Sequence, residues 1–480
     1  MKKQFAVTLF VLIIAASSVR AADGDLDITF GTGGKVTTDF DYSFFALHSD
    51  GKIVVAGRNQ NRLQLARYNI DGSLDAAFGS EGKVTPQFSG LRLWTQPTGI
   101  AVQPDEKIVV LSTFSPSYAI FEYSIARYNS DGSLDTTFGI EGTVTVKDRY
   151  ASSLRIQVDG RIVVAGSDSA SRRQLLERYT IDGSPDANFG AGGKIETDVF
   201  WGRVAIQADG KILLAGAVLT SGRGVVALAR YTSDGSLDTD FGSGGKVITT
   251  FPNPWPAMAT AVATQSDGKI VVAGGGLDVE SGLRFARYNS DGSLDTTFGV
   301  EGKVSDDVDA TSLAIQSDGK IIVGAGVYVA GLSLTRYDAD ASLDRSFGNG
   351  AYAPGDGVIA LALQFDGKIV ATAPYSLIRY NNSIPLVRFD RATVPLAGSF
   401  KATFSGREMT DDTYFDIRFR YPGSDTDHVT LNWQRGLSAE HGVPTSTMTG
   451  TWGITGVRPH LNASDHTSDF LFVSTDLRVE

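Results

Sequence analysis

One short run of oxygen-bearing side chains in this chain could hold a cation, Asn129-x-Asp131-Gly132-x-x-Asp135. Hard cations such as Ca²⁺ take several carboxylate and amide oxygens as ligands, and this spacing brings such oxygens together. The first ligand position, however, carries Arg127. A fixed guanidinium charge repels a cation and can itself bind a carboxylate. We therefore expect a structural ion pair between Arg127 and an aspartate, with calcium binding as the alternative.

The same arginine position recurs along the chain, and an aspartate accompanies each occurrence. The arginines are Arg67, Arg127, Arg178, Arg230, Arg287, Arg336 and Arg379. Their expected partners are Asp75, Asp135, Asp186, Asp238, Asp295, Asp344 and, if the chain closes on itself, Asp27. We expect these pairs to brace the fold. No metal site and no cofactor is predicted, apart from the calcium alternative.

Histidine and cysteine chemistry is restricted by composition. The chain has no Cys, which excludes disulfides, thiolate metal sites and cysteine nucleophiles. His48 could serve as a general base, but it occupies the position before a hairpin that holds glutamine in the other repeats, namely Gln103, Gln157, Gln207, Gln265, Gln316 and Gln364. We therefore interpret His48 as a substituted strand-end residue. The other histidines are His428, His441, His460 and His466. We expect them to be scattered surface residues; the alternative is that His460, Asp465 and His466 bind a metal ion.

The arginine, aspartate, glutamine and His48 positions named above belong to a sequence unit that occurs seven times before residue 384. It consists of Arg-Tyr, a turn, Leu-Asp-x-x-Phe-Gly, and an apolar stretch divided by Asp-Gly-Lys. The phenylalanines of this motif are Phe30, Phe78, Phe138, Phe189, Phe241, Phe298 and Phe347, which gives a period of 48 to 60 residues. Such a unit is too small to bury its own apolar face, so neighbouring units must pack together.

One unit, residues 302–338, indicates four strands. We expect them at residues 302–304, 312–316, 321–326 and 332–337, with a tight hairpin at Asp318-Gly319 because these residues tolerate positive φ. Four antiparallel strands form a propeller blade. The prediction is an all-β protein with a seven-bladed β-propeller at residues 22–383. The last unit lacks the Leu-Asp-x-x-Phe-Gly link, and residues 25–31 supply it, so we expect the ring to close through the N-terminal segment.

The repeat resembles that of the secreted bacterial propellers called delta-sixty repeat proteins. The resemblance is carried by Ala-Arg-Tyr-Asn-Ser-Asp-Gly-Ser-Leu-Asp-Thr-Thr-Phe-Gly at residues 286–299 and Gln-Ser-Asp-Gly-Lys-Ile-Ile-Val at residues 316–323. It departs from the pattern at Asp105-Glu106-Lys107, where Glu replaces Gly, and in the short seventh unit. The resemblance implies a fold and no particular activity.

The repeat stops near residue 384, and a different pattern follows. Apolar residues alternate with polar ones over residues 415–420 and 428–433, as in strands with one buried face. We predict that residues 384–480 form a small β-sandwich of the immunoglobulin-like type.

The first 21 residues are typical of a secretory signal peptide: two lysines, a mainly apolar run of twelve residues, and a small-x-Ala end. We therefore expect a secreted protein, extracellular, periplasmic or on the cell surface, with no transmembrane segment in the mature chain. The net charge of −11 argues against nucleic acid as a partner.

The function hypotheses rest on where the repeat varies. The loops between strands one and two, and between strands three and four, vary in length and share one face of the disc, which we call the variable face. We place in them the candidate ligand-binding residues Trp94, Tyr118, Trp201, Trp255 and Tyr328, together with Tyr42, Phe44, Phe121 and Tyr375. Loops on a rigid scaffold carry recognition, and aromatic rings supply stacking area; the alternative is that these rings fill gaps between blades.

The leading hypothesis is a non-enzymatic binding or surface-interaction protein whose ligand is a polysaccharide or peptide. The alternatives are a lyase- or lactonase-type enzyme acting in the central channel, without an assigned catalytic residue, and a calcium-dependent adhesion module. Carboxylates lining the channel would favour the enzyme, whereas small residues and paired charges there would favour the binding scaffold.

Overall fold

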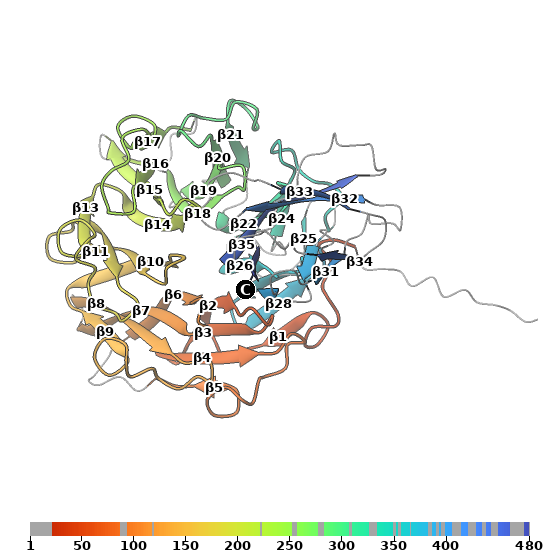
Figure 1. The fold of residues 1–480 in the computed structure, drawn as a ribbon. Helices are drawn as coiled ribbons and strands as arrows, with labels where there is room; N and C mark the ends of the chain where they lie inside the picture. Colours follow the sequence, from red (N-terminus) through yellow and green to blue (C-terminus); the bar gives the residue numbers. More distant parts are fainter. Residues whose placement is uncertain are drawn as a thin grey trace, which may run out of the picture.

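The computed structural model describes residues 22–86, 94–117, 120–220, 223–251, 257–276, 283–306, 310–325, 334–348, 352–353, 357–364, 366–382 and eight strand segments between residues 386 and 479. The first 21 residues, and with them the expected signal peptide, lie outside the described ranges. Residues 22–382 form seven four-stranded antiparallel sheets arranged around a common centre (Figure 1). These sheets are the blades of a seven-bladed propeller. Within the described ranges, no helix is long and apolar enough to cross a membrane.

Each blade has an inner strand, two middle strands and an outer strand. The inner strands are β2 (Tyr42–Leu47), β6 (Trp94–Val102), β10 (Arg149–Ile156), β14 (Phe200–Ile206), β18 (Ala257–Thr264), β22 (Ala310–Ile315) and β26 (Ala360–Leu363). The second strands are β3 (Ile53–Asn59), β7 (Ile108–Ser117), β11 (Ile162–Asp168), β15 (Ile212–Thr220), β19 (Ile270–Gly276), β23 (Ile321–Ala325) and β27 (Ile369–Ala373).

The third strands are β4 (Arg62–Tyr68), β8 (Ile120–Tyr128), β12 (Gln174–Tyr179), β16 (Arg223–Tyr231), β20 (Leu283–Tyr288), β24 (Leu334–Tyr337) and β28 (Ser376–Tyr380). The outer strands are β5 (Lys83–Val84), β9 (Thr143–Val146), β13 (Lys194–Thr197), β17 (Lys246–Thr249), β21 (Lys303–Asp306), β25 (Tyr352–Ala353) and β1 (Lys35–Thr37). We number the blades one to seven in the order of their inner strands.

The core lies between blades, because each sheet is apolar on both faces. Leu213 and Leu228 of blade four, for example, pack with Val262 and Val272 of blade five in one buried cluster. Inner strands of successive blades contact one another around the ring. Burial on both faces explains why the second strands contain nearly continuous apolar runs rather than alternating ones.

The structure corrects the predicted division of the repeat into blades. Residues 302–304 were expected to open a blade, but strand β21, which contains two of them, pairs with β20 of the preceding unit. The Leu-Asp-x-x-Phe-Gly link turns the chain back sharply, and the backbone N–H of Arg287 then donates to the carbonyl of Gly302 at 3.1 Å. The sequence repeat is therefore offset from the blade by one strand. Because pairing is antiparallel throughout each blade, the variable loops still share one face.

The N-terminal segment closes the ring, as the missing link predicts. Strand β1 pairs with β28 as the outer strand of blade seven, with Lys35 opposite Ile378 and Thr37 opposite Ser376. Upstream of β1, the backbone N–H of Gly24 donates to the carbonyl of Asn381 at 2.8 Å. The closing segment thus contributes a strand in addition to the link.

Residues 386–479 form two further sheets. One has the strand order β29 (Leu386–Phe389), β31 (Ser399–Ser405), β34 (Ser438–Gly442). The other has the order β30 (Thr393–Val394), β36 (Thr475–Val479), β35 (Gly450–His460), β32 (Tyr414–Arg420), β33 (Val429–Trp433). The alternating segments thus form strands, and an immunoglobulin-like packing of the two sheets stays a prediction.

Candidate functional site

The repeated arginines and aspartates lie in contact on the face opposite the variable loops. In each of the seven pairs, from Arg67 with Asp75 to Arg379 with Asp27, the arginine Nε donates to the aspartate Oδ2 at 2.7 to 2.8 Å. Both side chains of every pair are buried. Each guanidinium also lies over the phenylalanine ring of its motif, 4.3 to 4.7 Å from the ring centroid. We call each such cluster a latch.

Each latch also reaches the next blade around the ring. Arg67 donates through a terminal guanidinium nitrogen to the carbonyl of Ser130, and Arg379 donates across the closure to the carbonyl of Ile70. A hairpin cation adds a second charge to each aspartate; Lys368 Nζ, for example, lies 2.7 Å from Asp27 Oδ2. The guanidinium thus binds its own aspartate and a backbone carbonyl of the next blade, as expected for a structural brace.

The latch holds its carboxylate ionised. Burial alone would raise the pKa of Asp27, but the Lys368 ammonium, the Thr29 hydroxyl and the Arg379 charge outweigh it and lower that pKa to about 2. The pKa of Asp295 is lowered well below its usual range, because Thr297, Lys269 and Arg287 together outweigh the same burial penalty. Such shifts report strong native-state pairing.

His48 forms a variant contact between blades one and two. In three other blades a glutamine donates to the hairpin of the next blade; Gln103 Nε2, for example, lies 2.9 Å from the Gly160 carbonyl oxygen. The corresponding contact here is a pair between His48 Nδ1 and Glu106 Oε2 at 2.8 Å. Glu106 stands at the hairpin position that is Gly160 in the following blade, with a positive φ of 64°. The two departures from the repeat therefore meet in one contact, a coupling that sequence reasoning missed.

The calcium alternative gains no support from this geometry. Arg127 fills the first ligand position and binds Asp135 Oδ2 at 2.7 Å. Asp131 Oδ1 accepts hydrogen bonds from the backbone and hydroxyl of Ser133. Over the residues the structure describes, no group of three or more His, Cys, Asp or Glu side chains could hold a metal ion. The C-terminal histidines His428 and His466 lie outside the described residues.

Only part of the predicted aromatic set falls within the described residues: Tyr118, Trp255 and Tyr328 lie outside them. Trp94 and Trp201 were expected in loops, but Trp94 is the first residue of β6, opposite Ser115, and Trp201 is the second residue of β14. The inner strands extend further toward the variable face than expected, and several contain bulges, for example between Phe200 and Arg203.

Trp201 is held in a strained position on this bulge. Its φ is 53°, in the left-handed region that a bulky residue rarely occupies, and its side chain is 46% exposed. The ring lies against Phe200, with centroids 6.1 Å apart. An exposed tryptophan held at a costly backbone angle is a feature that packing alone does not explain.

Further rings line the same face on neighbouring blades. Tyr42 and Phe44 of blade one make an edge contact at 5.5 Å, and Phe121 of blade two meets Tyr150 of blade three at 6.0 Å. Phe121, like Trp201, is exposed, and the other rings are half-buried. We call the six residues Tyr42, Phe44, Phe121, Tyr150, Phe200 and Trp201 the aromatic arc; they follow four successive blades.

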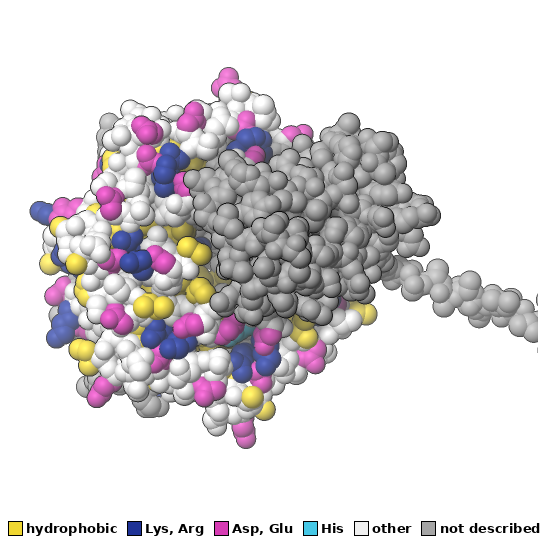
Figure 2. Space-filling model, viewed as in Figure 1, with side chains coloured by type: hydrophobic (Ala, Val, Ile, Leu, Met, Phe, Trp, Pro, Cys, Tyr) yellow, Lys and Arg dark blue, Asp and Glu magenta, His cyan; other side chains and the backbone are white. Residues whose placement is uncertain are grey.

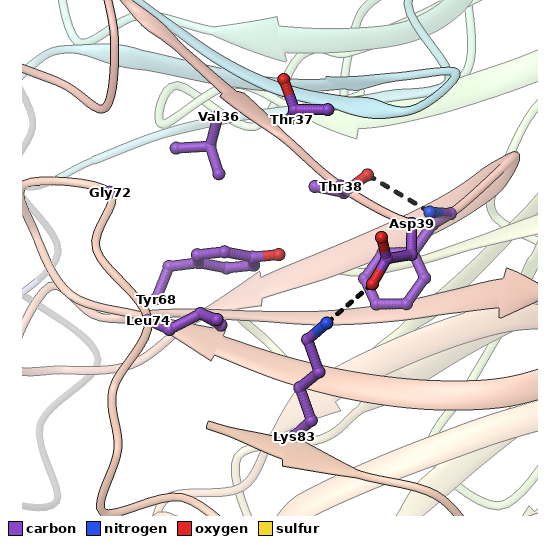
Figure 3. A pocket seen from close by; sticks show the side chains of 9 residues that line it. Val36, Thr37, Thr38, Asp39, Tyr68, Gly72, Leu74 and Lys83 are labelled. Atoms are coloured by element: carbon purple, nitrogen blue, oxygen red, sulfur yellow. Dashed lines mark hydrogen bonds and ion pairs between the residues drawn. The ribbon is translucent and has the colours of Figure 1, made fainter. Parts of the chain in front are cut away.

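A cavity of about 270 Å³ lies at the outer edge of the closure, between β1 and blade one (Figure 3). It is lined by Tyr68 and by the pair of Lys83 Nζ with Asp39 Oδ2, 2.7 Å apart. Burial, with the Asp39 charge, raises the pKa of Tyr68 to about 12. Lys246 and Asp198 form the same pair at 2.6 Å between blades three and four. The cavity is thus a variant of a repeated inter-blade contact rather than a distinctive ligand site.

Charge does not mark a binding surface on the face seen in Figure 2. Acidic and basic side chains are interspersed over the blades, and hydrophobic side chains gather nearer the centre of the ring. Among the described residues on this face, no basic patch is visible.

Six segments of the chain match the family described as "Domain of unknown function (DUF5122) beta-propeller": residues 48–78, 103–138, 157–189, 207–241, 265–298 and 316–347. Six of the seven repeats are thus similar to DUF5122 repeats. Each matched segment of the DUF5122 type begins at the His48 or glutamine position and ends at the latch phenylalanine. The match therefore covers the latch residues of these six repeats and leaves out the inner strands.

Several solved structures are similar to this chain at low identity. The extracellular domain of the BT4673 one component system from B. thetaiotaomicron has 12% identity and a TM-score of 0.42, over 89% of this chain and 52% of that one. Drosophila Semaphorin 1a extracellular domains 1-2 have 9% identity and a TM-score of 0.42, over 82% and 95%. The exo-beta-1,3-galactanase 1,3Gal43A from Clostridium thermocellum has 12% identity and a TM-score of 0.30, over 86% and 100%. This chain thus spans about half the length of the first of them. No curated protein matches the sequence.

Proposed function

We propose that this protein is a secreted, non-enzymatic binding protein of the delta-sixty repeat type, which recognises an extended ligand on the variable face of its propeller. In this proposal, residues 1–21 are a signal peptide, residues 22–383 are the binding platform, and residues 384–480 are an immunoglobulin-like spacer or anchor. The ligand is a polysaccharide or a peptide.

The observation that carries this proposal is the aromatic arc. Five of its six rings sit on inner strands and Phe121 sits on the third strand β8, rather than on free loops, so little conformational entropy would be lost on binding. They follow four blades, which suits a ligand longer than one sugar or one amino acid. Trp201 combines exposure of 46% with a positive φ of 53°, which is costly to maintain without a function.

The framework supports binding rather than catalysis. The charged side chains of each latch pair with one another. None of the seven inner strands contains an Asp or Glu that could serve as a general acid or base in the channel. The carboxylates that would have favoured a lyase or lactonase are thus missing from these strands.

The test is a glycan and peptide array probed with the secreted chain, followed by Trp201→Ala. Losing one stacking ring should weaken binding of the selected ligand by about 1–3 kcal/mol, roughly 5- to 150-fold in Kd. The melting temperature should hardly change because nearly half of the Trp201 side chain is exposed.

Val300→Ala is the matched control, since Val300 is 79% exposed but lies on the latch face. It should leave binding unchanged. The proposal fails if Trp201→Ala binds as the native chain does, or if both variants weaken binding equally.

A further inference from the structure

The strands around the axis of the ring carry an unbalanced set of charges. The seven inner strands contain no Asp, Glu or Lys, but they contain three arginines, Arg149, Arg155 and Arg203. The chain as a whole has 54 acidic and 43 basic residues. Positive charge is thus concentrated at the axis of a protein that is negative overall.

Two of these arginines have no carboxylate partner among the described residues. Arg149 forms an ion pair with Asp168. Arg203 instead bridges three blades through backbone carbonyls, with Nε 3.1 Å from the oxygen of Thr260 and a terminal nitrogen on that of Ser152. Arg155 donates only to the carbonyl of Leu154, at 2.8 Å. Among the residues that the structure describes, neither of these two meets a carboxylate, whereas every latch arginine does.

Packing does not explain Arg155. It stands two residues before the strand-end glutamine, where the other blades carry Ala46, Ala101, Ala205, Ala263, Ala314 and Ala362. The six alanines are buried or half-buried, whereas the Arg155 side chain reaches solvent. The surrounding blades still remove much of its hydration and lower its pKa, and the Arg203 charge lowers it further. Two guanidinium groups held near each other without an anion repel, at a cost that a bound anion would remove.

Neighbouring polar groups are also suited to an anion. Burial raises the pKa of Tyr42, while the charge of Arg203 and a hydrogen bond with Gln96 act against that rise. Tyr42 of blade one therefore lies within electrostatic reach of Arg203 of blade four. A phenol that stays protonated and a guanidinium both donate hydrogen bonds. A phenol donor near the Arg203 charge is suited to the acceptor oxygens of an oxyanion.

We propose that Arg155 and Arg203 form an axial binding site for an oxyanion, namely a carboxylate, sulfate or phosphate group that is either free or carried by an acidic polymer. Tyr42 belongs to both this site and the aromatic arc, but the site does not require the arc to bind a ligand of its own.

The test compares thermal unfolding of the full native chain with that of Arg155→Ala, in sulfate or phosphate and in sodium chloride of equal ionic strength. Sulfate stabilises many proteins by exclusion from their surface, so only the difference between the two proteins is informative. We expect a saturable rise in the native melting temperature, as binding to the folded state requires. In Arg155→Ala this rise should require at least about tenfold more anion, since a charge-assisted hydrogen bond is lost.

The basal melting temperature separates binding from a structural role. Arg155→Ala installs the residue found in the other six blades, so in sodium chloride it should melt at or above the native temperature. Arg203→Met serves as the second variant; it should abolish the anion effect, and its basal stability should fall because the bridge between blades is lost. An oligouronate and its neutral, esterified form, tested on the native chain, distinguish a polymer-borne carboxylate from a free ion.

The proposal is overturned if native and Arg155→Ala respond identically to every anion. It is also overturned if Arg155→Ala melts well below the native protein and keeps the full anion effect, because Arg155 would then be structural.

Discussion

Removing Arg287 tests whether the latches brace the ring. Its Nε lies 2.8 Å from Asp295 Oδ2, both side chains are 6% exposed, and the guanidinium carbon lies 4.4 Å from the centroid of Phe298. Deleting one partner of a buried pair costs about 3–5 kcal/mol, because the other charge is left without its partner. Lys269 Nζ remains 3.2 Å from the same oxygen, which places the loss at the lower end. The stacking contact adds up to about 1 kcal/mol. We therefore expect Arg287→Ala to lower the free energy of unfolding by about 3–4 kcal/mol.

The assay is urea unfolding of native protein, Arg287→Ala, Asp295→Asn and the double variant. A ring of repeated blades need not unfold in one step, so each transition should be followed by two probes. Arg287→Lys should recover only part of the loss, since an ammonium lacks the planar fork. Arg345→Ala is the matched control, an exposed arginine in the next link, and should change stability by less than about 0.5 kcal/mol. Strictly additive single-variant effects, or full stability in Arg287→Ala, would refute the bracing role.

Three further predictions concern the closure, acid and the variant contact. Deleting residues 23–31 should expose the edges of blades one and seven and lower the melting temperature; an unchanged melting curve would contradict the closure. Acid should destabilise the protein through Asp27: its folded pKa of about 2 lies below its usual 3.8, so its contribution is complete above about pH 4 and is lost as the pH falls toward 2. At 1.36 kcal/mol per unit this is about 2 kcal/mol, and Asp27→Asn should remove that part of the pH dependence of the melting temperature. His48→Gln and Glu106→Gly should each lower the melting temperature when made alone. The double variant should melt above either one, because it restores the glutamine-to-carbonyl contact and places glycine at the positive φ of 64°. A double variant less stable than both would show that the two positions are not coupled.

Local sequence patterns predicted the blades because the strands and hairpins of a blade depend on contacts between residues that are close in sequence. The Asp318-Gly319 hairpin and the alternating or apolar runs specify which strands exist and where they turn. They do not specify whether β21 pairs with the unit before it or with the unit after it, since both offer similar strand edges. The predicted blade boundary was wrong at this point. The predicted partners Arg287 and Asp295 lie in contact, while their effect on stability stays a prediction.

Features that depend on distant blades were beyond local patterns. His48 and Glu106 each departed from the repeat, but only the structure shows that their hairpins face each other. Arg155 and Arg203 lie on neighbouring strands, 48 residues apart in sequence, and their shared lack of a counter-ion is visible only once the inner strands are placed around one axis. Comparing the same position across all seven repeats identifies Arg155 among alanines, and this is a sequence signal that could have found it.

The pairing of β1 with β28 has a mechanical consequence. The strands are antiparallel, with Lys35 opposite Ile378, and the chain enters β1 at the same end at which it leaves β28. Tension between Asp23 and Asn382 would therefore open this joint one hydrogen bond at a time, as a zipper opens, instead of shearing all its bonds together. The Asp27 latch beside the joint would be the first strong resistance that such a force meets. A propeller stretched between its two ends should thus yield at this seam and release the N-terminal segment, while the other six blades remain folded.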